Sequence, residues 1–511
     1  MIKTPPRTIR GILGRLGPGL IIAGSIVGSG ELIGTTKTGA QAGFWLLWLV
    51  LIGCVIKVFT QVELGRYTLT TGKTTMEGLN EIPGPRWRVN WLLWYWLIMF
   101  LVSLAQLGGI AGGVGQALAI THPLTETGRR FNHYQDTRTR YQVEAAVLRL
   151  ETTRRQGHSA ATLRQRRVVD ALEAELKGLD SPPQSRDDLI WAGLITVVTA
   201  LLLSVGRYGL IQTVSTFLVA TFTFITIGSL VHLQTLDQWR VTGADFLNGL
   251  SFRLPPAAEN LGASPLATAL ATFGIIGVGA TELIQYPYWC LEKGYARWTG
   301  GWHPSPAWAR RARGWMRVLR WDAWCSALVY TFATLAFYLL GAAVLGRTGL
   351  DPEGAQMIRT LAEMYVPVFG SWAPLVFLFG AIAVLYSTFF VANAGHARVC
   401  ADALRVFGLS GGGTAAMRLW TRIFSGLFPL LCFLFYVWVR SPVRMVLASG
   451  VMQAVMLPML GASGLYFRYR RSDDRLQPGR LWDLLLWLSA LGLLIAGGWL
   501  ALTKIVPQLE L

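Results

Sequence analysis

The stretch GSIVGSGELIG, residues 24–34, decides the fold, because it places four glycines and a glutamate in the middle of an apolar segment. A glycine costs about 1 kcal/mol in a helix interior relative to alanine, and a carboxylate at the centre of a bilayer costs about 2.5–3.5 kcal/mol. A second stretch, GIIGVGATELIQYP over residues 274–287, repeats the pattern and adds a proline, which removes a helical hydrogen-bond donor. Aligned on Glu31 and Glu282, both stretches read Gly-x-x-Glu-Leu-Ile.

The rest of the chain is rich in apolar segments of membrane-spanning length. Of its 511 residues 52% are hydrophobic and only 14% are charged, and the mean hydropathy is +0.43, whereas soluble domains carry about 25% charged residues. This composition excludes an ordinary soluble enzyme, a disordered chain and a secreted disulfide scaffold. A spanning helix needs about 20 apolar residues, and about eleven segments satisfy this requirement: 17–36, 43–64, 91–120, 189–206, 208–232, 266–291, 321–346, 368–397, 416–438, 442–467 and 481–503.

The two interrupted segments are the first and the sixth of these eleven. They therefore occupy corresponding positions in a five-plus-five inverted repeat, and paired interrupted helices are the best indication in a sequence of a transporter's midplane site. The sequence predicts an all-α, multi-pass membrane protein of about eleven transmembrane helices, with inverted five-helix repeats in which helices 1 and 6 are broken.

The positive charge has a membrane explanation. Lys and Arg number 46 against 28 Asp and Glu, a formal net charge of +18. If the N-terminus lies inside, most basic residues outside one long insertion fall in the inner segments, as the positive-inside rule requires. We therefore expect a protein of the cytoplasmic (inner) membrane, embedded in the lipid bilayer with its N-terminus in the cytoplasm, and no nucleic-acid partner.

The insertion spans residues 121–188 and separates transmembrane helices 1–3 (residues 1–120) from helices 4–11 (residues 189–511). It is polar, and its apolar residues recur at helical spacing. We expect two amphipathic helices folded as a hairpin outside the bilayer, with a turn at residues 156–159 and Ser159 as a helix cap. The hairpin is either an arm for a protein partner or self-association, or an accessory insertion with no role in transport.

These motifs resemble the Nramp family of divalent-metal transporters, which has the LeuT-like fold. The resemblance is carried by Gly-Pro-Gly at residues 17–19, by Gly-Ala-Thr at residues 279–281 and by Asp322 at the start of the seventh segment. It is distant, and it covers most of residues 10–470 apart from the insertion. It implies a membrane transporter whose metal site lies at the two breaks.

The departures from the family pattern fall on its metal-binding motifs. The family's Asp-Pro-Gly-Asn in helix 1 aligns with residues 28–31, and its Met-Pro-His-Asn in helix 6 aligns with residues 283–286, so the aspartate, the thioether and the histidine are missing. An acidic residue of the family's third helix aligns with Gln106, which we interpret as a close-packing neighbour in a glycine-rich helix rather than as a ligand, the alternative reading. Such losses resemble divergent Nramp-related branches, some of which carry harder ions such as Mg²⁺.

The two glutamates are the predicted metal-binding carboxylates. Oxygen ligands suit Mg²⁺, Ca²⁺ or Mn²⁺, whereas thioether and imidazole ligands favour softer metals. The predicted site is all-oxygen, built from carboxylates, backbone carbonyls and polar side chains: Glu31, Glu282, Gly28, Ala280, Thr281 and Gln285. The cation is the transported substrate, no cofactor is expected, and no nucleophile–base motif or phosphate-binding loop indicates an enzyme.

Several other charged residues leave alternatives open. Lys57 lies within the second segment, where it either extends to the interface or pairs with an acid. Asp322 either contacts the unwound helix 6 or caps helix 7. Glu63 and Arg66 are interpreted as a solvated helix end, although an ion pair at an inner gate is the alternative.

Three functions follow from this reading, and the first is favoured. It is secondary-active or facilitative transport of a divalent cation of the Mg²⁺ or Mn²⁺ type by alternating access. The second keeps the fold but carries an amino acid or another small organic solute. The third is a non-transporting membrane receptor or scaffold that presents the 121–188 insertion to a partner.

Overall fold

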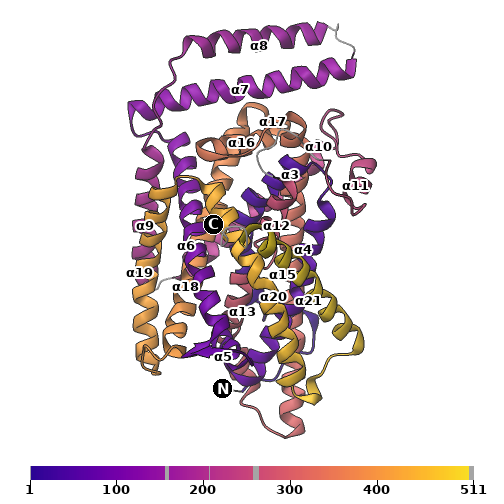
Figure 1. Ribbon diagram of the computed structural model, residues 1–511, viewed down its shortest axis with the longest axis vertical. Coiled ribbons are helices and arrows are strands. Elements are labelled where there is room, and N and C mark those ends of the chain that lie inside the picture. The colour runs from indigo at the N-terminus through magenta and orange to yellow at the C-terminus, as the bar shows by residue number, and fades with distance from the viewer. Residues whose placement is uncertain (1, 156–159, 206–207, 257–263, 506–511) are drawn as a thin grey trace.

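A computed structural model describes residues 2–155, 160–205, 208–256 and 264–505, and long helices running side by side form its core (Figure 1). The predicted segments correspond, within these ranges, to helices in the same order. They are α2–η1–α3 (Pro18–Ile26, Ser29–Thr35, Thr36–Ala42), α4 (Leu47–Thr71), α6 (Trp91–Thr121), α9 (Asp187–Val205), α10 (Tyr208–Leu233), α12–α13 (Pro265–Phe273, Ala280–Lys293), α15 (Pro306–Leu340), α18 (Ala373–Val406), α19 (Thr414–Val439), α20 (Pro442–Arg470) and α21 (Arg480–Leu500).

Length and composition alone qualify nine helices of the described chain as membrane spans. Two of the predicted segments fall outside that number. The α12–α13 segment is interrupted, and in α10 the apolar stretch counts as a shorter helix, Val219–Leu233. The protein is a multi-pass membrane protein.

Short elements connect the long helices. The helical ones are α1 (Ile9–Leu13), α5 (Thr75–Glu81), α11 (Gly243–Gly249), α14 (Tyr295–Thr299), η2 (Gly341–Gly346), η3 (Gly354–Gln356), α16 (Met357–Ala362), η4 (Glu363–Tyr365), α17 (Val366–Phe369), η5 (Gly370–Trp372), η6 (Asp474–Leu476) and η7 (Ala501–Ile505). Two strands of two residues each, β1 (Arg86–Trp87) and β2 (Val89–Asn90), pair antiparallel before α6.

Residues 121–188 contribute two helices, α7 (Glu126–Arg155) and α8 (Ala160–Gly178), which lie against each other across the end of the bundle opposite the N-terminus (Figure 1). The turn expected at 156–159, with Ser159 as cap, lies outside the described residues. Buried Arg359 of α16 holds α7, because its Nε is 2.7 Å from Asp136 Oδ1 and its Nη2 donates to Asn132 Oδ1 at 2.5 Å. The insertion is thus docked on the bundle through α16.

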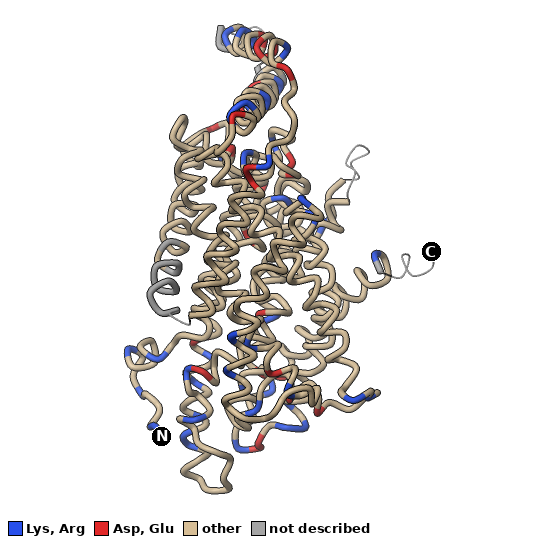
Figure 2. The backbone as a smooth tube through the Cα atoms, turned by 90° about the vertical axis from the view of Figure 1, so that its left-hand side faces the viewer, with Lys and Arg blue, Asp and Glu red and all other residues tan. Residues whose placement is uncertain are grey.

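Charged residues are segregated along the bundle. Lys and Arg gather at the end that holds the N-terminus and on the α7–α8 hairpin, and few charged residues lie between (Figure 2). A bilayer around the middle of the bundle accounts for this separation, since charge is costly in hydrocarbon.

Glycines allow close helix packing on one side of the bundle. A Cβ on Gly108 of α6 would collide with the carbonyl oxygen of Cys432 on α19, and one on Gly112 would collide with the Tyr436 ring. Small residues at such crossings let two backbones approach, as in other membrane helices. The glycine-rich half of α6 is therefore a packing surface.

The interpretation of Glu63 and Arg66 as a solvated helix end is wrong. Helix α4 continues to Thr71, and the two residues are 0% and 3% exposed. Arg66 Nε and Nη2 lie 2.9 and 3.1 Å from the Glu63 carboxylate oxygens. Arg66 Nη1 also donates to the Leu476 carbonyl at 2.7 Å, and the Trp482 indole donates to Glu63 at 2.7 Å. The α20–α21 connection and the start of α21 bury this ion pair, and neither is near it in sequence.

Breaking this buried pair should destabilise the protein strongly. We expect Arg66→Met to lower the free energy of unfolding by about 3–5 kcal/mol, because it leaves a buried carboxylate without its partner. Unfolding in mixed detergent micelles measures the change. The matched control is Arg129→Met on α7, since Arg129 forms the same i,i+3 pair with Glu126 at 59% and 70% exposure and should cost less than about 1 kcal/mol. Equal losses in the two variants would contradict the assignment.

Candidate metal-binding site

The first helix breaks between α2 and η1. Val27 and Gly28 leave the helical conformation, with ψ of 74° and −111°. A side chain cannot replace the glycine, because a Cβ on Gly28 would collide with the Thr388 hydroxyl of α18. The Gly28 carbonyl accepts the Leu32 amide at 2.8 Å, so one of its two lone pairs is engaged.

The sixth helix breaks between Phe273, the last residue of α12, and Ala280, the first residue of α13. Gly277 has φ of +56°, in the left-handed region that favours glycine. A Cβ on Gly274 would collide with the Gly450 carbonyl of α20. Helices 1 and 6 are therefore both broken, as predicted from their glycines.

Glu31 connects the two breaks. It is 0% exposed, and its Oε1 accepts the Gly277 amide at 3.2 Å and the Thr334 hydroxyl at 3.1 Å. Its Oε2 is buried and has no hydrogen-bond partner among the described residues. A buried carboxylate oxygen without a partner carries an uncompensated desolvation cost, and a bound cation is one way to remove it.

Glu282 lies in the first turn of α13, where the helix dipole favours a carboxylate. It is partly buried, and its Oε2 is 2.9 Å from the Thr281 hydroxyl, which is also 3.0 Å from Gln453 Oε1. The Thr281 amide donates to the same Gln453 oxygen at 3.2 Å. Gln453 of α20 thus holds the start of α13.

A chain of polar side chains joins the two breaks by a second route. Gln453 Nε2 donates to Gln106 Oε1 at 2.9 Å, and Gln106 Nε2 donates to Ser29 Oγ at 3.0 Å. Ser449 Oγ also donates to Gln106 Oε1, at 2.7 Å. Gln106 is the hub of this network between η1, α6, α20 and α13. The interpretation of it as a packing neighbour rather than a ligand stays a prediction.

The remaining predicted ligands are placed less favourably. Ala280 is buried at the start of α13, where the helix engages its carbonyl with the amide four residues on. Gln285 is 3% exposed and packs against α18, because a Cβ on Gly395 would collide with its amide group. Glu31, Thr281 and Glu282 make polar contacts at the two breaks, and the six residues remain a predicted site.

No group of three His, Cys, Asp or Glu side chains in the described chain comes close enough to hold a metal. A cation between the glutamates therefore needs amide, hydroxyl, carbonyl or water oxygens as well, which suits a hard ion. Sequence reasoning missed Thr334, Ser449 and Gln453. The only signal for them was a polar side chain inside an apolar span.

Lys57 is expected either to extend to the membrane interface or to pair with an acid, and the described residues show neither arrangement. It is fully buried on α4, and its ammonium donates to the backbone carbonyls of Phe273 and Ile276, the latter at 2.8 Å. The ammonium therefore lies at the break of helix 6.

Of the two expectations for Asp322, the contact with helix 6 is confirmed at Tyr286, and the cap of helix 7 is wrong. Asp322 lies inside α15, which begins at Pro306. Its carboxylate accepts the amides of Gly17 and Gly19 at 2.8 and 2.6 Å and the Tyr286 hydroxyl at 3.1 Å. Asp322 therefore caps the start of helix 1 and joins it to α13, downstream of the break in helix 6.

Ion pairs close the bundle at the hairpin end. Lys37 of α3 is 2% exposed, and its Nζ lies 2.5 Å from Asp351 and 2.9 Å from Glu353. Gln41 donates to Asp351 at 2.8 Å. We call these four residues the hairpin-end latch. A cavity of about 590 Å³ beside it is lined by Asp351 and Glu353 and by α7 residues that include Gln135.

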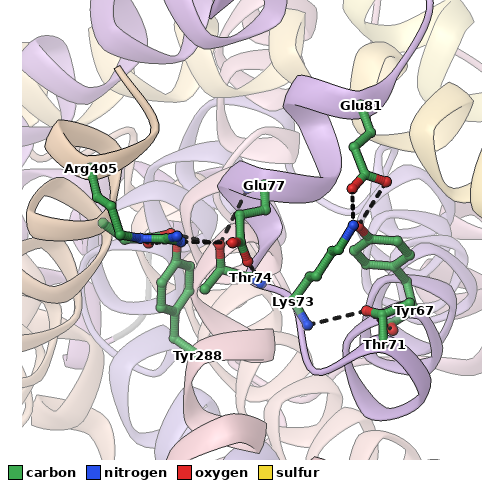
Figure 3. Close-up of polar contacts among 9 residues, drawn as sticks. Tyr67, Thr71, Lys73, Thr74, Glu77, Glu81, Tyr288 and Arg405 are labelled. Atoms are coloured by element: carbon green, nitrogen blue, oxygen red, sulfur yellow. Dashed lines mark hydrogen bonds and ion pairs between the residues drawn. The ribbon is translucent and has the colours of Figure 1, made fainter. Parts of the chain in front are cut away.

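A second group closes the N-terminal end (Figure 3). Asp402 of α18 accepts the Tyr288 hydroxyl of α13 and the Thr74 hydroxyl before α5, both at 2.6 Å. Arg405 pairs with Asp402 at 2.6 Å and with Glu77 at 2.9 Å. We call these five residues the N-terminal-end latch. It joins α5, α13 and α18.

The arrangement is that of a multi-pass membrane protein with two broken helices at its centre. A manganese transporter from Eremococcus coleocola, solved as a mutant, superposes with a TM-score of 0.57 at 13% identity, covering 97% of this chain and 88% of that chain. MhsT in complex with L-phenylalanine gives a TM-score of 0.54 at 16% identity, covering 97% and 99%. At these identities the likeness concerns the fold alone, and it confirms the predicted LeuT-like architecture.

The family model described as natural resistance-associated macrophage protein-like, Nramp, matches residues 184–503. The chain belongs to the Nramp family, whose members are transporters and not enzymes. The predicted resemblance to this family is confirmed.

Similar proteins include an uncharacterized protein of Pasteurella multocida, PM0681, which is 26% identical over 42% of this chain and 54% of its own length. The divalent metal cation transporter MntH of Yersinia enterocolitica is 30% identical over 24% of this chain and 30% of its own length. MntH of Deinococcus radiodurans is 30% identical over 22% and 25%. The chain spans about half or less of the length of these relatives.

Removing the carboxylate of the N-terminal-end latch should open that end. Ala394 lines a cavity of about 270 Å³ between α2, α13 and α18. We expect Asp402→Ala to increase maleimide labelling of an Ala394→Cys probe by roughly tenfold, since charge-assisted hydrogen bonds contribute about 1.5–3 kcal/mol each. Labelling is measured in a background in which the native cysteines are replaced.

The control is Asp474→Ala, which removes an exposed carboxylate in η6 outside the latch. Labelling that rises equally in both variants, or in neither, would contradict the assignment of Asp402 to closure of this end.

Proposed function

We propose that this protein carries a divalent cation of the hard Mg²⁺ or Mn²⁺ type across the cytoplasmic membrane by alternating access. Membership of the Nramp family supports transport, and the MntH relatives are named as divalent metal cation transporters. The single observation that carries the proposal is the buried Glu31 Oε2, which lacks a hydrogen-bond partner among the described residues, at the junction of two broken helices.

The donor set favours a hard ion. Glu31 and Glu282 supply carboxylate oxygens, and Thr281, the free lone pair of the Gly28 carbonyl and water supply neutral ones. The positions that hold methionine and histidine in the family motif are Leu283 and Gln285 here, so no soft ligand competes. Mg²⁺ keeps several of its waters and needs only one or two carboxylates, which matches this site.

The two latches support alternating access. The hairpin-end latch ties α3 to the segment after η2, and the N-terminal-end latch ties α13 and α18 to α5. Opening one end at a time would expose the polar groups at the two breaks to only one side of the membrane. We place the N-terminal end in the cytoplasm, because outside the α7–α8 hairpin Lys and Arg gather there (Figure 2), and a long loop such as residues 121–188 translocates largely regardless of its charge.

Uptake into proteoliposomes tests the proposal. The parent protein should take up Mg²⁺ or Mn²⁺, and Glu31→Gln and Glu282→Gln should each reduce uptake by at least about tenfold, because even indirect partners of a metal site contribute ten- to hundredfold. Glu126→Gln on the exposed face of α7 is the matched control and should transport normally.

Normal transport by both site variants would refute the proposed site. Thermal-shift measurements on the purified protein address the cargo, with Mg²⁺ and Mn²⁺ compared against a panel of amino acids. Stabilisation by an amino acid and by neither metal would favour an organic solute as substrate.

A further inference from the structure

Lys57 lies where helix 6 leaves its regular conformation. Its side chain is 0% exposed, its ammonium donates to the Phe273 and Ile276 carbonyls, and it lies 4.7 Å from the centre of the Phe273 ring. The side chain is thus buried at its full length, with its charge held against backbone oxygens.

Those two carbonyls need a partner. The backbone amides that follow α12 donate to other carbonyls: Gly274 donates to Ala271, and both Ile275 and Ile276 donate to Thr272. Carbonyls at the end of a helix carry partial negative charge, and inside a membrane no bulk water is present to satisfy them. The ammonium of Lys57 supplies the missing positive charge.

The Glu31 carboxylate also lies at this break of helix 6. Glu31 accepts the amide of Gly277, the residue directly after Ile276. Backbone carbonyl oxygens are also ligands of alkali-metal cations, and here a tethered ammonium occupies two of them.

We propose that the Lys57 ammonium fills a monovalent-cation site at the break of helix 6 and so takes the place of a dissociable alkali ion. The site itself does not depend on the cargo. Its consequence for transport rests on the function proposed above. The parent protein then needs no Na⁺ or K⁺, and removal of the ammonium creates a site that an alkali cation can enter.

A binding measurement tests the site without transport. The melting temperature of the purified full-length protein is measured in NaCl, KCl and N-methylglucamine chloride at equal ionic strength. We expect the parent to show no difference. Lys57→Ala should show a saturable rise of a few degrees in NaCl or KCl, because a ligand that binds only the folded state stabilises it.

The matched control is Lys293→Ala. Lys293 also donates to a backbone carbonyl, that of Leu16 at 3.0 Å, but it is partly exposed at the N-terminal end and removal of its ammonium should create no alkali-ion dependence. An equal response of the parent, the control and Lys57→Ala overturns the proposal. So does a folded Lys57→Ala that responds to neither cation.

If Lys57→Ala does not fold, Lys57→Met is measured instead, because methionine keeps most of the side-chain volume. If neither variant is monodisperse in NaCl or KCl, an alkali ion does not replace the ammonium and the proposal fails. In proteoliposomes, divalent-ion uptake by a folded variant should fall at least tenfold in N-methylglucamine and recover in NaCl or KCl. A parent that transports no divalent ion while Lys57→Ala still gains alkali-ion stabilisation refutes the proposed cargo and leaves the cation site supported.

Discussion

The hydrogen bond from the Gly277 amide to the Glu31 carboxylate is the interaction on which the rest of the structure depends. A helix that breaks inside a membrane exposes polar backbone, and this cost is tolerable only where protein groups satisfy it. Glu31, from one break, satisfies an amide of the other break. Lys57 satisfies two carbonyls of that same break. The two breaks therefore stabilise each other, and neither helix can be interrupted alone without leaving buried groups unpaired.

The latches at the two ends follow from this junction. Because the breaks divide helices 1 and 6 into halves, each half can move with its own end of the bundle. Asp322 holds the N-terminal half of helix 1, and Lys37 holds the other half. The Gln106 network spans the middle, between the halves. Short polar contacts at the ends and a polar network across the middle are what the proposed carrier needs if its ends move and its site stays in place.

The breaks were predictable, and their partners were not. Glycines and a glutamate inside an apolar run oppose helix formation wherever the chain folds, so residues 24–34 and 274–287 carry their own signal. The identity of the group facing each glutamate depends on crossings between helices far apart in sequence. Lys57 is an example, because a long charged side chain could equally reach the membrane interface, pair with an acid or donate to two carbonyls, and the sequence does not identify which. The buried Glu63–Arg66 pair is a second example, since the loop that covers it lies about 400 residues away in sequence.

The lysine also changes the charge balance of the proposed cycle. With both glutamates ionised and no lysine, the empty site carries two negative charges and the loaded site none. With Lys57, the empty site carries one negative charge and the site loaded with a divalent ion carries one positive charge. Because the cost of burying charge grows with its square in a continuum description, a double charge costs about four times a single one. The lysine therefore makes the cost of burying net charge equal for the loaded and the empty carrier, both of which must reorient in every cycle.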